Sequence, residues 1–553
     1  YIRSHFFTGP LAKLVEHMTD EQLWKLTRGG HDPQKVIAAY QRAVETKGRP
    51  TVILAKTVKG YGMGEAGEGK NITHQQKKMN EEELLEFRSR FGIPLSDEEV
   101  RDLPFYKPPE NSPEIQYLKK RREALGGFVP SRREDFPPME VPSEDFYQEF
   151  FKSSGDREVS TTMGYVLLLS RLLADKKIGK HIVPIIPDEA RTFGMEALFR
   201  QYGIYSPIGQ LYEPVDKETL LFYNEKKDGQ ILEEGITEAG AISSFIAAGT
   251  SYSTFGFPMI PCYIFYSMFG FQRIGDFVWA AADMKVKGFL LGATAGRTTL
   301  NGEGLQHQDG HSHLLASVIP SIRSYDPAYV YEVATIVQDG LERMYVKQED
   351  LFYYLTLYNE NYKQPEMPKD VKEGILKGLY KIREPQIDSK PSVHLFGSGP
   401  ILEEALKAAK LLEEEFKIGA HVWSATSYNI LRKEALEADR WNRLHPKEKK
   451  ESYLHKIAKE LKEPVVAASD YLSSVPHQIA PWIPRMLSLG TDGFGRSESR
   501  EALRRYFEVD KEFIALSAVY QLVQEGFKSL KDLEEAIHVL RIEPDKTWGL
   551  TGC

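Results

Sequence analysis

From about residue 157 onward, short apolar runs rich in β-branched and aromatic residues alternate with stretches that have the composition of helices. Strand-like runs occupy residues 181–190, 257–269, 288–296 and 351–361, and helix-like stretches occupy 160–175 and 238–253. Strands that alternate with helices in this way predict an α/β fold built on a mainly parallel sheet.

A second segment of the same kind begins at residue 392, where a strand, a Gly-Ser-Gly turn and a helix run through to residue 416. A stretch rich in Pro and Lys at 363–390 separates it from the first. Because 553 residues are too many for one compact core, we expect successive mainly parallel sheets, each flanked by helices. The expected divisions are a first domain at 1–97, a linker at 98–156, and two further domains at 157–365 and 366–553.

The first domain predicts helices, then a strand, then a glycine-rich loop. Asp32 before Pro33 is a typical helix start, with a capping side chain followed by a favoured first-turn proline. The run "PTVILAKTV" at 50–58 predicts a strand that is buried on both faces. Five glycines then fall between positions 60 and 69, which predicts a loop.

The composition is that of a globular protein without a basic stripe. The net charge of −8 comes from 71 basic and 79 acidic residues, so nucleic acid is not an expected partner. No apolar run approaches the roughly 20 residues that cross a bilayer, so no membrane association is expected. Only Cys262 and Cys553 are present, which fits a reducing, cytoplasmic location. Since the chain has no initiator Met, we interpret it as a piece of a longer protein.

The stretch "LNGEGLQHQDGHSH" at 300–313 is the richest cluster of candidate ligands in the chain. His307, Asp309, His311 and His313 could bind a cation, yet their spacing does not fit a usual zinc site and no cysteine is near. A solvent-exposed turn and a catalytic loop are the alternatives, and the residues alone do not decide among the three.

Acidic residues at two places in the chain, the pair Asp188 and Glu189 and the single Glu238, have both a functional and a structural interpretation. Asp188 and Glu189 lie at the carboxyl end of the buried strand in the run 181–190, which is where open α/β sheets bind ligands, although Asp188 could simply cap the next helix. Glu238 begins a helix rich in Gly and Ala. With few polar neighbours, its carboxyl should have a raised pKa and exchange protons near neutral pH, but it could equally be a first-turn residue that stabilises the helix dipole.

Longer motifs follow one another in a fixed order along the chain. They are "GGHDPQKV" (29–36), "KTVKGYGMGEAGEGKNITHQ" (56–75), "IIPDEARTFGMEALFRQYGIYSP" (185–207), "ILEEGITEAGA" (231–241), "FYSMFGFQRIGD" (265–276), "GRTTLNGEGLQHQDGHSH" (296–313) and "GTDGFGRSESREALRRYFEVD" (490–510). Together they strongly resemble the homodimeric type of pyruvate dehydrogenase E1, the thiamine-diphosphate-dependent component, over essentially the whole chain.

The resemblance implies a transketolase-like thiamine-diphosphate-binding fold and a function for each expected domain. Residues 1–97 would be the end of the diphosphate-binding domain, 157–365 the aminopyrimidine-binding domain, and 366–553 a transketolase-like C-terminal domain. The GDG…N motif that binds Mg²⁺ and the diphosphate in this family does not occur here. The chain therefore resembles the C-terminal three fifths of the family's polypeptide, and no metal ligands are expected in it.

In this family thiamine diphosphate supplies the chemistry, because its thiazolium carbon attacks the 2-oxo acid and its ring takes up the electrons left by CO₂ loss. By resemblance, Glu238 exchanges a proton with N1′ of the aminopyrimidine. Tyr266 and Phe269 match an aromatic wall around that ring, although the residues alone favour a core position for them. His307 matches a histidine that lies near the substrate in the family. Of the three interpretations of the stretch at 300–313, the resemblance therefore favours an active-site loop without metal.

The glycine-rich loop corresponds to a lid that closes over the active site in the family. His74, within this loop, is expected to serve the acetyl-transfer half-reaction, and Lys59 is expected to approach the substrate or the cofactor. Asp188 and Glu189 match an acidic pair that lines the site. The segment from 205 to 223 is interpreted as a second loop that orders on binding.

The implied partners are pyruvate, the lipoyl domain of the dihydrolipoamide acetyltransferase (E2), and a second copy of the chain in a homodimer, since the family's site lies between subunits. The implied cofactors are thiamine diphosphate and Mg²⁺. A transketolase or a 2-oxoglutarate decarboxylase is the nearest alternative. A metal-dependent hydrolase that uses the His-rich loop and a scaffold without catalytic activity are the alternatives from other classes.

Overall fold

The computed structural model describes residues 1–26, 29–75, 78–128, 136–187, 193–215, 223–388 and 390–550. The chain forms two compact units, residues 1–128 and 129–553, which we describe separately. No helix in the described part of the chain has both the length and the apolar character needed to span a bilayer.

The first unit is built from short helices joined by irregular segments. Its elements are α1 (Ile2–Phe6), η1 (Gly9–Val15), α2 (Asp20–Trp24), α3 (Pro33–Glu45), η2 (Gly64–Ala66), η3 (Asn71–His74), α4 (Glu81–Phe91), α5 (Asp97–Arg101) and α6 (Pro113–Ala124). As predicted, α3 begins with Asp32, whose carboxylate accepts backbone N–H groups of Gln34 and Lys35, and Pro33 occupies the first turn.

The predicted buried strand at 50–58 is not formed: these residues belong to no strand, and all of them are exposed. A strand needs a neighbour to satisfy its backbone N–H and C=O groups, and the described residues of the first unit contain no other strand. The glycine-rich loop is present. Within it, Gly60 has φ +74° and lies so close to the Gly67 carbonyl that a Cβ atom would clash with it.

The second unit contains a six-stranded sheet in the order β5-β2-β6-β7-β9-β8, with every neighbouring pair parallel. Its strands are β2 (Ile182–Ile186), β5 (Leu232–Glu233), β6 (Ile260–Tyr266), β7 (Phe289–Ala293), β8 (Ile322–Tyr325) and β9 (Phe352–Leu357). Every residue of β7 and β9 is buried, which explains why these strands read as continuous apolar runs in the sequence.

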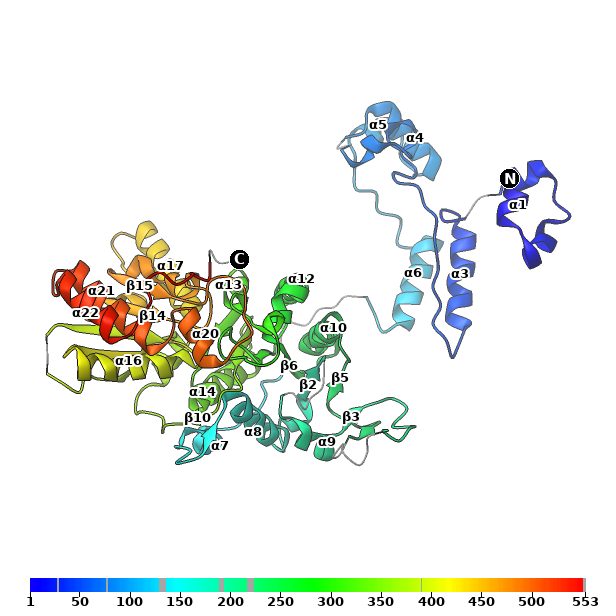
Figure 1. Ribbon diagram of the computed structural model, residues 1–553. Helices are drawn as coiled ribbons and strands as arrows, with labels where there is room; N and C mark the ends of the chain where they lie inside the picture. The colour runs from blue at the N-terminus through cyan, green and yellow to red at the C-terminus, as the bar shows by residue number, and fades with distance from the viewer. Residues whose placement is uncertain are drawn as a thin grey trace. The chain divides into compact units, whose positions relative to one another are not determined.

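Helices cover both faces of this sheet. The connections β5-α10-β6, β6-α12-β7 and β7-α13-β8 all run toward the β8 side of the sheet, whereas β8-α14-β9 runs back. Because connections between parallel strands are right-handed, helices of the two directions lie on opposite faces. Helix α14 therefore lies on the face opposite to α10, α12 and α13, where it contacts α8 (Figure 1). The helices are α8 (Thr161–Leu173), α10 (Glu238–Gly249), α12 (Gly270–Asp283), α13 (Ser312–Ser317) and α14 (Val330–Leu341).

Shorter elements complete this lobe. They are α7 (Glu144–Tyr147), η4 (Gln148–Phe151), β1 (Glu158–Val159), η5 (Gly179–His181), α9 (Glu196–Tyr202), β3 (Ile204–Tyr205), β4 (Glu225–Lys226), α11 (Ser251–Phe255), η6 (Ser267–Phe269), η7 (Leu305–His307), η8 (Glu342–Val346) and β10 (Tyr362–Lys363). Tyr147, Phe150 and Phe151 are buried in the core of this unit, so the residues of α7 and η4 are an integral part of it.

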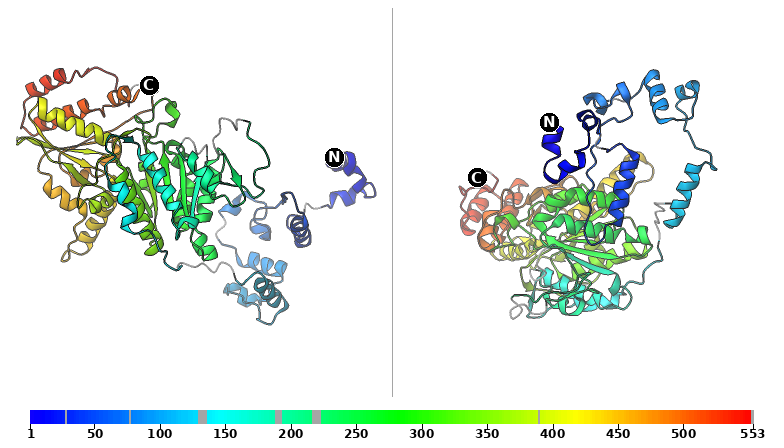
Figure 2. Two further views of the ribbon diagram at one scale, coloured as in Figure 1. Left: turned by 90° about the horizontal axis from the view of Figure 1, so that it is seen from below. Right: turned by 90° about the vertical axis from the view of Figure 1, so that its right-hand side faces the viewer.

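A second, five-stranded sheet forms the C-terminal lobe, drawn in yellow to red in Figures 1 and 2. Its order is β11-β13-β12-β14-β15, and only the edge strand β11 is antiparallel. The strands are β11 (Tyr380–Arg383), β12 (Ser392–Gly397), β13 (Gly419–Ser424), β14 (Val465–Ala468) and β15 (Met486–Leu489). The expectation of an α/β fold with successive mainly parallel sheets is thus confirmed.

The helices of the C-terminal lobe are α15 (Lys372–Lys377), α16 (Ile401–Glu415), α17 (Tyr428–Leu444), α18 (Tyr453–Glu460), α19 (Ser474–His477), η9 (Ala480–Trp482), α20 (Arg500–Tyr506), α21 (Lys511–Gln524) and α22 (Leu530–Val539). The helix expected after the Gly-Ser-Gly turn is α16, which packs on β12 and β13 and against α21. On the side of the first lobe, α17 contacts β8, so the two lobes are joined.

His394 of β12 makes the stability of this lobe sensitive to acid. Burial lowers the pKa of His394 to about 4, helped by the neighbouring imidazole of His421 and opposed by Glu463. The unfolded chain binds a proton near pH 6.5 and the folded chain does not, so acid favours unfolding. Between pH 7 and pH 5 we expect this group to lower the free energy of unfolding by about 2 kcal/mol.

The measurement is urea unfolding at both pH values for the wild type and for His394→Gln. Glutamine retains an oxygen that can accept the N–H of Trp423, which His394 accepts at 3.1 Å, but it does not titrate. The variant should lose about 2 kcal/mol less stability on acidification than the wild type. An identical pH dependence in both proteins would show that His394 is not the group that titrates.

Candidate active site

Three segments that carry predicted site residues leave the carboxyl ends of three strands in the six-stranded sheet, β5, β6 and β7. Glu238 opens α10 just after β5, Tyr266 is the last residue of β6, and His307 lies in the connection that follows β7. Because these strands are parallel, their carboxyl ends meet at one edge of the sheet, the edge at which open α/β sheets bind ligands.

Three aromatic side chains form a cluster at this edge. The ring centroids of Tyr266 and His307 are 5.0 Å apart, those of Phe269 and His307 are 5.1 Å apart, and those of Tyr266 and Phe269 are 6.0 Å apart. Tyr266 and Phe269 are only half-buried, whereas their neighbours Tyr263 and Phe265 belong to the core. The core interpretation of this aromatic run therefore holds for some of its members, and the two predicted site residues are the partly open ones.

Glu238 is the first residue of α10, next to the capping residue Thr237, whose hydroxyl accepts the backbone N–H of Gly240 at 3.2 Å. Its side chain is only 12% exposed. The sequence predicted few polar neighbours for this carboxylate, and that prediction is wrong. Arg273 of α12 donates from Nη1 to Glu238 Oε1 at 2.7 Å.

The same arginine also contacts the aromatic cluster. Its guanidinium carbon lies 3.9 Å from the centroid of the Phe269 ring, in cation–π geometry. Arg273 thus joins Glu238 to Phe269, and all three side chains belong to one site. Arg273 is not among the residues predicted from the sequence, although its position four residues after Phe269 is the helical spacing that brings two side chains together.

The loop that carries His307 is anchored by a buried aspartate of the C-terminal lobe. The two carboxylate oxygens of Asp470 accept the backbone N–H groups and the hydroxyl groups of Thr298 and Thr299, at 2.6–3.1 Å. Burial raises the pKa of Asp470, and these hydrogen bonds oppose the rise. Four donors on one carboxylate fix the start of the loop rigidly.

A second anchor lies directly beside His307. The buried side chain of Gln308 donates from Nε2 to the Leu300 carbonyl at 2.9 Å and accepts the backbone N–H of Arg496 at 2.8 Å. Arg297, also buried, donates to the Thr491 carbonyl at 2.7 Å. The long motif at 490–510 therefore supports the His-rich loop from the C-terminal lobe.

The other members of the His-rich stretch have structural environments. Asp309 is fully buried and accepts the hydroxyl of Ser267 and the backbone N–H groups of His311 and Ser312, the last two at 2.9 and 3.0 Å. His313 is buried beside Thr356, at 3.1 Å from its hydroxyl, and burial lowers its pKa. In the part of the chain that the structure describes, no three metal-ligating side chains come together.

Four further predicted residues lie either outside the described residues or in the first unit. Asp188 and Glu189 lie outside the described residues, as does part of the predicted second loop between 205 and 223. His74 and Lys59 belong to the first unit, where both are exposed. His74 ends the short helix η3, and Lys59 begins the glycine-rich turn by accepting the backbone N–H of Gly69 at 2.9 Å.

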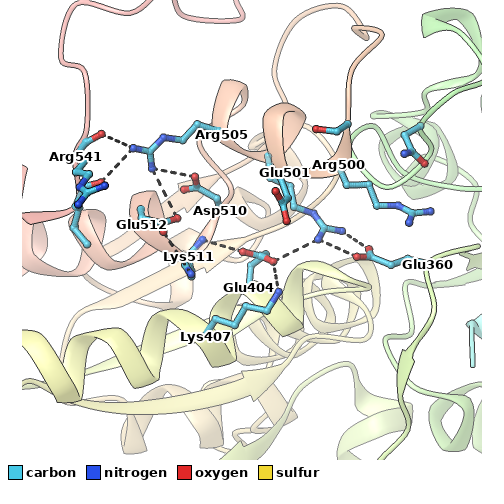
Figure 3. Close-up of a pocket in the computed structure, with 14 residues that line it drawn as sticks. Glu360, Glu404, Lys407, Arg500, Glu501, Arg505, Asp510, Lys511, Glu512 and Arg541 are labelled. Carbon is cyan, nitrogen blue, oxygen red and sulfur yellow. Dashed lines mark hydrogen bonds and ion pairs between the residues drawn. The ribbon is translucent and has the colours of Figure 1, made fainter. Parts of the chain in front are cut away.

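A separate cavity of about 760 Å³ lies elsewhere in the second unit and has strongly charged walls (Figure 3). Arg504 donates to Glu360 and Glu404, and Arg505 donates to Asp510 at 3.1 Å. Burial raises the pKa of Asp510 to about 6. No predicted site residue is among the lining residues. Because opposite charges on its walls are paired with one another, we interpret this cavity as part of the ion-pair network that joins the two lobes.

Comparison with known proteins agrees with the sequence motifs. Residues 140–365 match the pyruvate dehydrogenase E1 component middle domain, and residues 378–510 match the transketolase-like C-terminal domain. The pyruvate dehydrogenase E1 component of Pseudomonas aeruginosa strain PAO1 is 56% identical over 99% of the chain, and that of Escherichia coli strain K12 is 50% identical over 99%. The chain spans 62% of the length of each of these relatives.

Solved transketolases share the fold at low sequence identity. The enzyme from Campylobacter jejuni aligns with a TM-score of 0.58 at 18% identity, covering 88% of this chain and 65% of that one. The enzyme from Leishmania mexicana aligns with a TM-score of 0.59 at 16% identity, covering 89% and 65% of the two chains. The comparisons do not favour the alternative functions considered from the sequence. Residues 140–365 therefore belong to the pyruvate dehydrogenase E1 component middle-domain family and residues 378–510 to the transketolase-like C-terminal domain family, and the fold is transketolase-like.

Proposed function

We propose that this chain provides the aminopyrimidine side of a thiamine diphosphate site in a pyruvate dehydrogenase E1. The whole protein would decarboxylate pyruvate oxidatively and transfer the acetyl group to the lipoyl domain of the dihydrolipoamide acetyltransferase. The observation that carries the proposal is the meeting of Glu238, Phe269 and His307 at the carboxyl edge of the parallel sheet, in a chain 56% identical to a pyruvate dehydrogenase E1 component.

The residues at this edge fit a flat, nitrogen-rich heterocycle. The guanidinium of Arg273 is itself planar and cationic, and it bonds to the Glu238 carboxylate while it stacks on Phe269. An aminopyrimidine that shares a proton with a carboxylate offers the same combination of a charged N–H donor and a flat face. These contacts of Glu238 and Phe269 support the aminopyrimidine as the ligand of this site.

Within the proposed reaction Glu238 moves a proton. When bound, thiamine diphosphate supplies a nucleophilic carbon and a ring that accepts electrons. The Glu238 carboxylate would share a proton with the pyrimidine nitrogen N1′, which makes the neighbouring 4′-amino group a stronger base. Its low exposure keeps water from competing for that proton.

His307 has a defined tautomer in this arrangement. Its Nδ1 lies 2.7 Å from the carbonyl oxygen of Glu303, an acceptor that requires the proton to be on Nδ1. The neutral ring therefore presents Nε2 as a proton acceptor. This supports a role in which His307 takes up a proton at Nε2 and then donates a hydrogen bond to the pyruvate carboxylate.

The remaining roles rest on the resemblance to the family. His74 and Lys59 would belong to a lid that excludes water and presents the acetyl group to the lipoyl domain. Asp188 and Glu189 would line the same site. Mg²⁺ would be bound with the diphosphate by residues that this chain does not contain, and a homodimer would complete the site. A cytoplasmic location would follow from the same function.

Replacing Phe269 by Ala tests whether the aromatic wall binds the cofactor. Stacking of a flat heterocycle on an aromatic side chain contributes about 1–3 kcal/mol, so we expect the affinity for thiamine diphosphate to fall roughly tenfold. Calorimetric titration of the full-length protein measures it. Phe277→Ala, at an exposed position of α12, the helix that directly follows Phe269, is the matched control. Equal affinities of the Phe269 variant and the wild type would remove Phe269 from the site.

A further inference from the structure

Arg273 occupies two contacts that the proposed cofactor site needs for its ligand. It pairs with the Glu238 carboxylate at 2.7 Å, and its guanidinium covers the Phe269 ring at 3.9 Å. One side chain thus holds both the proton-sharing group and the stacking surface. An aminopyrimidine that bonded to the same carboxylate oxygen and stacked on the same face of Phe269 would need the space that the Arg273 guanidinium occupies.

We propose that Arg273 is a placeholder that keeps the aminopyrimidine site closed and leaves it when the cofactor binds. The proposal rests on the function proposed above. It makes Arg273 a positioning residue that acts through Glu238, since the arginine would hold the carboxylate in its orientation until the pyrimidine nitrogen takes its place.

The surroundings of Arg273 allow this exchange. Its side chain is 47% exposed, so the guanidinium can be solvated when it leaves, whereas Glu238, at 12% exposed, cannot remain unpaired without cost. Directly after Arg273, α12 is interrupted at Ile274, whose φ of −125° and ψ of 15° are not helical. Arg273 therefore ends a short first segment of the helix rather than lying within a continuous one.

The placeholder lowers the apparent affinity for the cofactor. If Glu238 and Phe269 are free in only a fraction of molecules, the apparent dissociation constant rises in inverse proportion to that fraction. Half-exposed ion pairs and cation–π contacts are weak, so this fraction should be roughly one third to one tenth. Removing the guanidinium should then tighten cofactor binding about three- to tenfold.

The test is titration of the full-length protein, as wild type and as Arg273→Met, with thiamine diphosphate and Mg²⁺ by calorimetry or tryptophan fluorescence. Methionine keeps the length and the apolar stem of arginine but has no charge and no donor. We expect the dissociation constant to fall three- to tenfold. Loss of a positive charge alone should weaken the binding of an anionic cofactor, so the expected direction is opposite to the general electrostatic effect.

Three controls make the result specific. Lys347→Met removes an exposed charge that is paired with Glu342, and it should not tighten binding. Arg273→Lys keeps the charge but not the planar stack and should give an intermediate affinity. In a double-mutant cycle, Arg273→Met should have a smaller effect once Glu238 is replaced by Gln, because the ion pair is lost while the contact of Arg273 with Phe269 remains.

The outcomes separate the placeholder from the site itself. If Glu238→Gln weakens binding while Arg273→Met leaves it unchanged or weakens it, the cofactor site stands and the placeholder is refuted. If Arg273→Met weakens binding by more than Lys347→Met does, the arginine contributes to the bound state, which also refutes the placeholder. If Glu238→Gln has no effect on affinity or turnover, the proposed function loses its central residue and the placeholder falls with it.

Discussion

Replacing Glu238 by Gln in the full-length protein is expected to lower the rate of pyruvate decarboxylation at least about 100-fold, the usual contribution of a positioned proton-transfer group. Glutamine has nearly the same size as glutamate and can still bond to Arg273, but it cannot take up and release a proton at neutral pH. The rate of CO₂ release with an artificial electron acceptor measures the effect.

The fold should survive this substitution. Glu238 lies at the first position of α10 and forms an ion pair with a half-exposed arginine, so the loss of stability should be about 1 kcal/mol or less. Glu342→Gln is a suitable control. Glu342 directly follows α14, in the segment that leads to the first residue of β9, and so it lies toward the amino ends of the parallel strands, away from the candidate site. Near-normal turnover by a folded Glu238→Gln variant would remove Glu238 from the mechanism.

Replacing His74 by Ala is expected to separate the two half-reactions. Decarboxylation measured with an artificial acceptor should be largely retained, whereas acetylation of the lipoyl domain should fall at least about tenfold, because a lid residue that exchanges a proton is needed only for the transfer. Both rates are measured on the same full-length preparation, the second by mass spectrometry of an isolated lipoyl domain.

The control for this variant is Asn71→Ala, at an exposed position of the same short helix η3. It should change neither rate, since the backbone of the turn is held by other contacts, among them the Thr73 hydroxyl, which donates to the Lys70 carbonyl at 2.6 Å. An equal fall of both rates in His74→Ala would contradict a role confined to acetyl transfer and would point to a general effect on the lid.

The parallel sheets could be predicted from the sequence because their strands are buried on both faces. Continuous apolar runs such as β7 and β9 have no exposed face that would require polar residues. The helices that flank the sheet have clear caps, as at Ser160 before α8. The same pattern misled at residues 50–58, because a run of strand-forming residues says nothing about whether a neighbouring strand is available to pair with it.

The ion pair and the anchors of the candidate site could not be predicted in the same way. Arg273 and Glu238 are 35 positions apart, and Asp470 is more than 170 positions from the threonines that it binds. Such pairs form only after α10 packs on α12 and the two lobes meet, so no local spacing in the sequence reveals them. The motifs located His307, Tyr266 and Phe269, but the side chains that hold them in place became visible only with the fold.

The central claim is that Glu238 shares a proton with the pyrimidine ring of the cofactor. A crystal structure of the full-length protein with thiamine diphosphate tests it most directly. We predict the Glu238 carboxylate within about 3.2 Å of N1′, Phe269 against the face of the ring, and Arg273 displaced from both. A Glu238 side chain that points away from the cofactor, beyond hydrogen-bonding distance of N1′, would contradict the account.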